Sequence, residues 1–235
     1  MADSHSKKIG FRLAPEVTQL GATGAFLVVE NFRNRASDPA FEELLSETLR
    51  NVAAAPNGDD PVLQGFRQLH DAIHRSNKRF VAAPENLLRL VQQHGRMPRV
   101  NLLVDIYNLV SIKTRLALGA HDLAGITGDV ELRLTLGSEP FHPLGAPEPT
   151  TVGKGEYAYI DGSGEVLCRL EVRQCEKTKV TLETTGAFFI IQGNRATPPA
   201  ALRAAADELI RLTTAFCGGE ARLLQFSGES PQSKP

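Results

Sequence analysis

The feature that most constrains the fold is a largely apolar segment in the middle of the chain, Val100–Ala117 (VNLLVDIYNLVSIKTRLA). A run without a continuous polar face is typical of an element buried on all sides, so it predicts a buried helix or a strand–helix pair. Asp105 and Asn108 interrupt it three positions apart, which places them on one face of a helix. A buried carboxylate or amide is costly unless it is paired. Each residue therefore either joins a hydrogen-bonded network or lines a pocket.

The remaining sequence divides into helical and strand-like patterns. Apolar residues at helical spacing predict helices that begin at Pro39 and that cover Pro61–Arg75, Pro84–His94 and Pro199–Phe216. Short or alternating apolar runs predict strands within Ile9–Phe32, Val130–Leu136, Tyr157–Ile160, Val166–Val172, Lys179–Glu183 and Ala187–Gln192. The pattern predicts an α+β fold, in which helices flank a mostly antiparallel central sheet.

The length of 235 residues suits one large domain or two small ones. No linker rich in proline and serine separates a helical part, about 37–99, from a β-rich part, about 100–226. We therefore expect a single domain over residues 1–226. The polar residues 227–235 are expected to form a disordered tail.

Charge and motif content argue against several classes of protein. The net charge of −1 gives no chain-wide attraction to nucleic acid, and DNA is not an expected partner. Three cysteines without a CxxC spacing favour a reducing cytoplasm over a disulfide framework, and neither a secretory signal nor a membrane span is expected.

Nucleotide-binding loops and serine-hydrolase signatures are missing, so no cofactor is expected. His70 and His74 have a metal-compatible spacing but lack a third ligand, which favours a solvated helix face and no metal.

Basic residues gather in the middle of the chain. Between Arg67 and Arg115 there are nine arginines and lysines against three acidic residues. This local excess indicates either a scattered solvated surface or a face that approaches phosphate groups.

Two polar groupings could carry chemistry. The first is His121, which stands beside a carboxylate in the segment Gly119–Asp122, where the glycine predicts a turn. The imidazole either positions a water or accepts a proton, or it has a structural role. Arg169, Glu171 and Arg173 alternate along a predicted strand, so they should project from one face into a polar cavity or into solvent.

Several segments resemble one known family. They are NLLVDIYNLVSIKTRLALGAHDL (Asn101–Leu123), GDVELRL (Gly128–Leu134), GKGEYAYID (Gly153–Asp161) and KVTLETTGAFFII (Lys179–Ile191). Together they resemble the editing domain of the bacterial phenylalanyl-tRNA synthetase β subunit, and more closely its free-standing single-domain relatives. The helical lead-in Arg75–Asn101 is similar to one that those relatives carry.

The resemblance implies an α+β fold whose pocket holds the aminoacyl end of a tRNA. In the synthetase this domain hydrolyses tRNA charged with the wrong amino acid. Asn108 falls on the asparagine that lines the editing pocket, whereas Gly119 stands where the synthetase usually has a histidine. The resulting hypothesis is a trans-editing hydrolase that deacylates mischarged aminoacyl-tRNA. The alternative is a non-catalytic module that binds tRNA or an amino acid.

The hypothesis assigns three sets of site residues. The catalytic candidates are Asn108, His121 and Asp122. The substrate-binding candidates are Asp105, Arg169, Arg173 and Glu176, and the phosphate-binding candidates are Arg79, Arg96, Arg99, Lys113 and Arg115. The expected partners are mischarged tRNA and a synthetase or translation factor.

Overall fold

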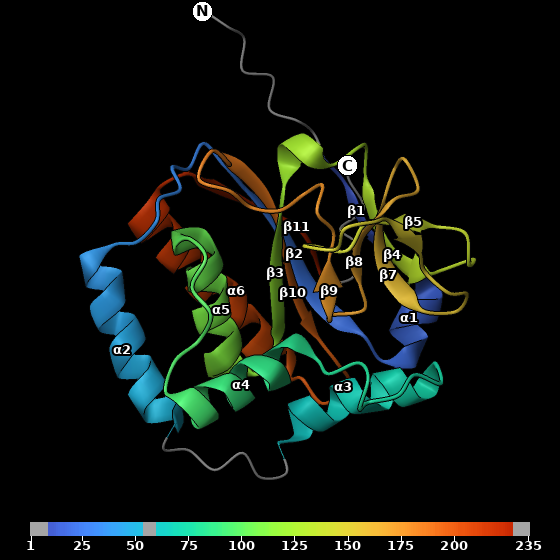
Figure 1. Cartoon of the computed structure of the whole chain (residues 1–235), viewed down its shortest axis with the longest axis horizontal. Helices are drawn as coiled ribbons and strands as arrows, with labels where there is room; N and C mark the ends of the chain where they lie inside the picture. The colour runs from blue at the N-terminus through green and yellow to red at the C-terminus, as the bar shows by residue number, and fades with distance from the viewer. Residues whose placement is uncertain (1–8, 54–59, 228–235) are drawn as a thin grey trace, which may run out of the picture.

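A computed structural model describes residues 9–53 and 60–227 of the chain (Figure 1). The helices are α1 (Pro15–Leu20), α2 (Pro39–Ala53), α3 (Pro61–Ala72), α4 (Ala83–His94), α5 (Leu102–Thr114), the short 3-10 helix η1 (Leu123–Gly125) and α6 (Pro199–Cys217). The strands are β1 (Phe11–Leu13), β2 (Thr23–Glu30), β3 (Ala117–Asp122), β4 (Val130–Leu134), β5 (Pro140–Phe141), β6 (Thr150–Thr151), β7 (Tyr157–Asp161), β8 (Val166–Arg169), β9 (Arg173–Gln174), β10 (Gly186–Gly193) and β11 (Glu220–Phe226). Apart from Ser227, the expected disordered tail lies outside the described residues.

The strands form two main sheets. One has the order β11-β2-β10-β3 and is antiparallel throughout. The other has the order β1-β4-β7-β8-β9, in which only the β1–β4 pair is parallel, and β5 and β6 form a small separate pair. The predicted α+β fold with mostly antiparallel sheets flanked by helices is confirmed.

The four-stranded sheet is the central layer, and its side chains enter two cores. In β2, Ala25, Leu27 and Val29 face the core made with α2, α4, α5 and α6, whereas Phe26 and Val28 face the core made with the other sheet. This is the alternation expected of a strand that is covered on both faces. Figure 1 shows these four helices on one side of the sheet and the second set of strands on the other.

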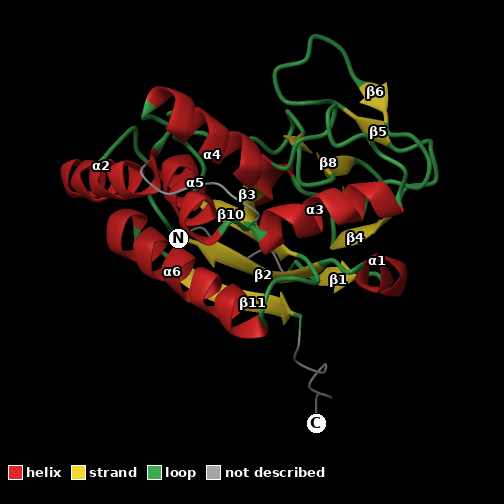
Figure 2. Cartoon of the chain, turned by 90° about the horizontal axis from the view of Figure 1, so that it is seen from below, coloured by secondary structure: helices red, strands yellow, loops and turns green. Residues whose placement is uncertain are grey.

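Helix α3 contributes to both cores, with Leu63 in the core of the helical layer and most of its buried apolar side chains in the second core. Seen from below, it lies across the end of the strands (Figure 2). Its Phe66 and Leu69 are buried in the core between the two sheets. This position brings the end of α3 near the β8–β9 hairpin, which matters for the site described below.

The long apolar segment forms α5, so the helical alternative is confirmed, with strand β3 following the helix. The side chain of Asn101 accepts a hydrogen bond from the backbone N–H of Val104 at 3.1 Å and caps the start of the helix. Arg115 ends it in the left-handed conformation, with φ of 64°. Ten of the 13 helical residues are buried, because α5 packs between α4, α6 and the four-stranded sheet.

Three local predictions are wrong. The first segment contains the short helix α1 as well as strands, because Pro15 begins a single helical stretch that buries only Val17. Lys179–Glu183 is not a strand: the hydroxyls of Thr181 and Thr184 accept backbone N–H groups there and fold the segment into a turn. Gly119–Asp122 is not a turn but the end of strand β3, paired with β10.

Within the described residues, no helix is long and apolar enough to span a membrane. The three cysteines, Cys168, Cys175 and Cys217, are all free and buried.

Candidate functional site

A cavity of about 480 Å³ opens where α4, α5 and β3 meet the β8–β9 hairpin. Its polar lining falls into three groups that differ in exposure. Exposed arginines form the rim, namely Arg79, Arg89 and Arg173. Buried polar side chains form the inner wall, namely Tyr159, Glu171 and Gln192. Asn108 and Gln174 add two amide side chains of intermediate exposure.

The rim is cationic because its arginines are not neutralised. Arg89 donates to Oδ1 of Asn86 at 2.6 Å, Arg173 donates to the backbone carbonyl of Leu144 at 2.5 Å, and the guanidinium of Arg79 lies near its neighbouring phenyl ring. None of the three has an acidic partner among residues 9–53 and 60–227. Three unneutralised guanidinium groups at one mouth favour an anionic ligand.

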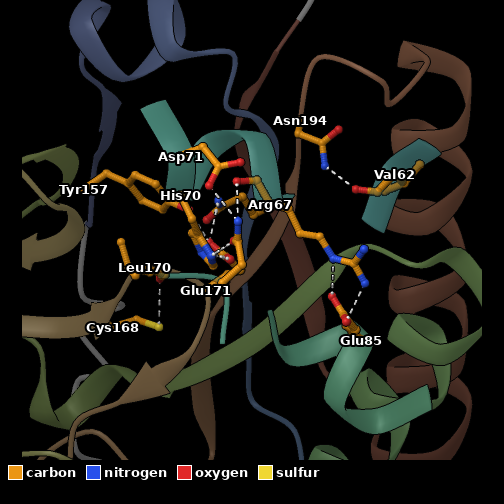
Figure 3. Close-up of polar contacts among 12 residues, drawn as sticks. Val62, Arg67, His70, Asp71, Glu85, Tyr157, Cys168, Leu170, Glu171 and Asn194 are labelled. Carbon is orange, nitrogen blue, oxygen red and sulfur yellow. Dashed lines mark hydrogen bonds and ion pairs between the residues drawn. The ribbon is translucent and has the colours of Figure 1, made fainter. Parts of the chain in front are cut away.

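The inner wall is organised around the carboxylate of Glu171. Tyr157 donates its hydroxyl to Oε2 of Glu171 at 2.5 Å, and Nε2 of His70 lies 2.6 Å from Oε1 (Figure 3). The amide of Gln192 approaches Oε2 at 3.5 Å, and the same side chain accepts the hydroxyl of Tyr159 at 2.6 Å. The inner wall is therefore a connected polar network in a buried setting, which fixes its side chains in place.

His70, at the end of α3, is a site residue that the sequence did not reveal. Its side chain is only 1% exposed, so the predicted solvated face is wrong for His70, whereas His74 is exposed. Nδ1 lies 3.1 Å from Oδ1 of Asn77, whose amide in turn donates to Asp71 at 2.7 Å. Burial alone would lower the pKa of His70, but the adjacent carboxylate of Glu171 outweighs it and raises the pKa above 6.5, although Nε2 and Oε1 do not meet in hydrogen-bond geometry.

A glycine is needed on the cavity side of β3. A Cβ at Gly119 would lie 2.5 Å from Nε2 of Gln174, so the Gln174 amide occupies the space that a side chain would take. This contact accounts physically for Gly119 at the position where the synthetase resemblance would place a histidine.

Comparison with known proteins decides the family. A family model described as the B3/4 domain matches residues 69–218, more than half of the chain. The chain belongs to the B3/4 domain family. A crystal structure of an N-terminal fragment of the phenylalanyl-tRNA synthetase β subunit from Pyrococcus horikoshii is similar in fold, with a TM-score of 0.51 and 15% sequence identity. The alignment covers 92% of this chain and 51% of that fragment, so this chain spans about half its length. No curated protein matches the sequence.

The family assignment and the shared fold confirm the resemblance seen in the sequence. Within this B3/4 fold, the predicted catalytic residues are separated. Asn108 lines the cavity, whereas His121 is fully buried in β3, with Nδ1 2.6 Å from the hydroxyl of Thr178. That hydroxyl also lies 3.0 Å from Sγ of Cys175. Burial lowers the pKa of His121 to about 3, so the imidazole is neutral at pH 7.

Asp122 does not orient the imidazole of His121, contrary to the prediction. One of its oxygens accepts the backbone N–H of Ala124 at 2.9 Å, and the other accepts the hydroxyl of Thr184 at 2.6 Å. Successive residues of a strand project to opposite faces, which is why neighbours in the sequence are apart here.

Asp105 and Asn108 also have different surroundings, although both lie on α5. The carboxylate of Asp105 pairs with Nε of Arg99 at 2.7 Å and accepts the backbone N–H of Val100 at 3.2 Å. The network alternative therefore describes Asp105, and the pocket alternative describes Asn108.

Arg169, Glu171 and Arg173 do not share a strand face. A tight turn at Leu170, with φ of 54°, reverses the chain so that Arg169 pairs with Arg173 across the β8–β9 hairpin. Arg169 binds Glu156 at 2.6 Å, outside the cavity, while Arg173 lies at the rim and Glu171 points to the inner wall. The single strand predicted over Val166–Val172 is thus wrong beyond Arg169.

Glu176, the other acidic candidate, is partly exposed and lies outside the cavity. It forms an ion pair with Lys179 and accepts the backbone N–H of Gly145 at 2.9 Å. The acidic side chain that does line the cavity is Glu171.

Most of the central basic excess is neutralised locally. The ion pairs are Arg67 with Glu85, Arg75 with Glu156, Arg99 with Glu42 and Asp105, Lys113 with Glu208, and Arg115 with Asp60. Of the phosphate-binding candidates, Arg79 lies at the rim and Arg96 is exposed on the loop after α4. Arg99, Lys113 and Arg115 are engaged in the ion pairs named above.

A metal site is not formed by His70 or its neighbours. Within the part of the chain that the structure describes, no group of three or more histidine, cysteine, aspartate or glutamate side chains is arranged to hold a metal ion.

Proposed function

We propose that the chain binds the aminoacylated 3′ end of a tRNA in the cavity and hydrolyses the ester of a mischarged amino acid. The observation that carries this proposal is the charge layout of the cavity, with free guanidinium groups at the rim and a carboxylate on the inner wall. An aminoacyl-tRNA end has the complementary layout, because phosphates lie on the nucleotide side and an ammonium group on the amino-acid side. Membership in a family related to a tRNA synthetase subunit supports the same substrate class.

The rim is the binding element of this proposal. Arg79, Arg89 and Arg173 are placed to contact phosphates of the single-stranded 3′ end, while the amino acid enters toward the inner wall. Phosphate contacts release counterions, so binding through the rim should weaken as salt rises.

The chemistry asks little of the protein, because the ester is already activated. The oxygen of a water molecule attacks the ester carbonyl, the bond from that carbon to the ribose oxygen breaks, and the ribose hydroxyl receives a proton. The products are the free amino acid and uncharged tRNA. Positioning of the water and stabilisation of the developing oxyanion are the main tasks of the site.

Two donors are available for the oxyanion. The first is the side-chain amide of Asn108. The second is a backbone N–H of the edge strand β3. The N–H of Asp122 points away from the sheet and donates to the backbone carbonyl of Thr178. N–H groups two residues apart on a strand point the same way, so Leu118, which lines the cavity, also directs its N–H away from the sheet.

The hydrolysis is tested with a panel of tRNAs, each charged with a different amino acid. We expect Asn108→Ala to slow deacylation of the best substrate about 100-fold, in the range typical for loss of one oxyanion donor. Asn51→Ala removes an exposed amide on α2 that does not line the cavity, and is the matched control. Hydrolysis of none of the esters by the folded wild-type protein would refute the deacylase proposal.

Binding is tested by the salt dependence of tRNA affinity. Arg79→Gln with Arg89→Gln should flatten the log–log salt slope by about 1.4, at roughly 0.7 per phosphate of a single strand. Arg67→Gln with Lys113→Gln removes the same charge from ion-paired positions and should leave the slope nearly unchanged. Salt-sensitive binding without any hydrolysis would favour the non-catalytic binding module, an alternative supported by the full burial of His121 outside the cavity lining.

A further inference from the structure

Glu171 is the single acidic side chain that lines the cavity within the described residues. Its side chain is only 2% exposed, and three exposed arginines line the same cavity. A carboxylate in such a position is costly to bury unless it is paired, so its surroundings show what it can still bind.

Two residues outside the cavity lining contact this carboxylate, and Tyr157 is the one that donates a hydrogen bond to it. Tyr157 binds one oxygen and His70 approaches the other, and neither of these residues lines the cavity (Figure 3). Gln192 reaches the first oxygen only at 3.5 Å. A carboxylate can accept about four hydrogen bonds, and Oε1 of Glu171 is buried without a hydrogen-bond partner among the described residues, so this lining residue keeps unused acceptor capacity.

We propose that Glu171 receives the α-ammonium group of the bound aminoacyl ester, and that the site therefore requires a free α-amino group. This inference rests on the function proposed above and names the substrate class more narrowly. The cavity accepts aminoacyl-tRNA, and it rejects tRNA whose amino acid is N-acylated, such as formylated or peptidyl forms.

The charge layout favours the α-ammonium over an amino-acid side chain as the group that Glu171 binds. Every aminoacyl ester carries an ammonium group one carbon from the reacting carbonyl, whereas side chains differ. N-acylation removes both the positive charge and two of the donors, and it leaves the Glu171 carboxylate facing an amide. A buried site built for a donor discriminates strongly against a ligand that lacks it.

The first experiment uses the wild-type protein. Deacylation rates are measured for the most rapidly hydrolysed aminoacyl-tRNA of the panel and for its N-acetylated form, each divided by its uncatalysed rate. We expect the N-acetylated form to be accelerated at least about 100-fold less, by loss of a charged hydrogen bond in a buried site. Equal acceleration of both forms would overturn the role of Glu171 and leave the deacylase proposal standing.

The second experiment compares Glu171→Gln with Glu176→Gln, which changes a nearby carboxylate outside the cavity. Glu171→Gln should lower the rate on the free-amino substrate about 100-fold and leave the N-acetylated substrate within about threefold, which removes the selectivity. Glu176→Gln should retain wild-type selectivity. Retained selectivity in a folded Glu171→Gln protein would overturn the inference, and if that variant does not fold, the wild-type comparison decides.

Failure of the proposed function has a different signature. If the wild-type protein hydrolyses no ester of the panel, the competition of alanyl-tRNA and N-acetyl-alanyl-tRNA for binding replaces the rate measurement. Preferential binding of the free-amino form would then support the role of Glu171 without catalysis. Equal binding of the two forms would overturn it.

Discussion

Two buried histidines occupy different electrostatic surroundings in this protein. His70 meets the carboxylate of Glu171 beside the cavity, whereas His121 meets the neutral hydroxyl of Thr178 inside the fold. The pKa of His70 is raised by its acidic partner, and that of His121 is lowered to about 3 by burial. The difference teaches that the charge of the partner, and not burial as such, sets the direction in which the pKa of a buried imidazole moves.

The comparison also separates sequence proximity from spatial proximity. His121 is followed directly by an acidic residue, Asp122, which caps η1 instead of binding the ring. The acidic partner of His70 is far along the chain, at the turn of the β8–β9 hairpin. Only the packing of α3 across the end of the strands brings these two residues together (Figure 2).

The largest expected effect comes from breaking the charged pair. His70→Ala leaves the Glu171 carboxylate buried without its imidazole partner, so we expect a loss of about 3–5 kcal/mol in the free energy of unfolding. Arg67→Ala breaks an ion pair whose arginine is 50% exposed, and it should cost at most about 1 kcal/mol. Denaturant unfolding of both variants measures the contrast.

A double variant sharpens this prediction. His70→Ala combined with Glu171→Ala should cost less than the sum of the two single changes, because neither charge is then left unpaired. Strict additivity would show that the two side chains do not stabilise one another.

Replacement of the neutral histidine, His121, should cause a smaller loss of stability and leave the activity per folded molecule unchanged. His121→Ala removes a buried ring and one partner of the Thr178 hydroxyl, so we expect a cost of about 2–3 kcal/mol. Deacylation measured well below the melting temperature should stay within about twofold of wild type. A tenfold slower rate in the fully folded variant would return His121 to the catalytic machinery.

The fold was largely predictable from the sequence, because its signals are local. Apolar spacing located α5 and the neighbouring helices, and alternation located strands such as β4 and β10. The exceptions are elements with weak local signals. Helix α1 buries a single side chain, and β11, which no pattern indicated, is an edge strand with four exposed residues at its start.

The candidate site was predictable only where one residue stood out from its local pattern. Asn108 interrupts an apolar helix, and it lines the cavity. Glu171 and His70 could not be joined from the sequence, because the hairpin depends on a left-handed residue, Leu170, which is not a glycine or asparagine. The prediction that Arg169, Glu171 and Arg173 share one face of a strand is wrong for the same reason, because the turn at Leu170 ends the strand.

The smallest expected effect is the dependence of stability on pH, where the two histidines act in opposite directions. His70 has a raised pKa in the folded state, so its contribution is fully present below about pH 6.5 and is lost as pH rises through the folded value. His121 has a lowered pKa, so the unfolded chain binds a proton below about pH 6.5 while the folded protein does not until about pH 3. Stability should therefore fall on the acid side because of His121 and on the alkaline side because of His70.

Each arm of this profile can be removed separately. Between pH 6.5 and pH 5, His121 should lower the free energy of unfolding by a slope that approaches about 1.4 kcal/mol per pH unit. The window stays above 4.5, the ordinary pKa of a glutamate. Burial opposes ionisation of Glu139 and Glu156, but the pKa of Glu139 is lowered by the backbone N–H of Leu136 and by Arg133, and that of Glu156 is lowered by Arg169 and Arg75. His121→Asn should flatten the acid arm alone, and His70→Gln the alkaline arm alone, in denaturant unfolding at half-unit steps of pH. An acid arm that keeps its slope in His121→Asn would show that another group carries the proton uptake, because a neutral buried imidazole requires the slope to vanish with the ring.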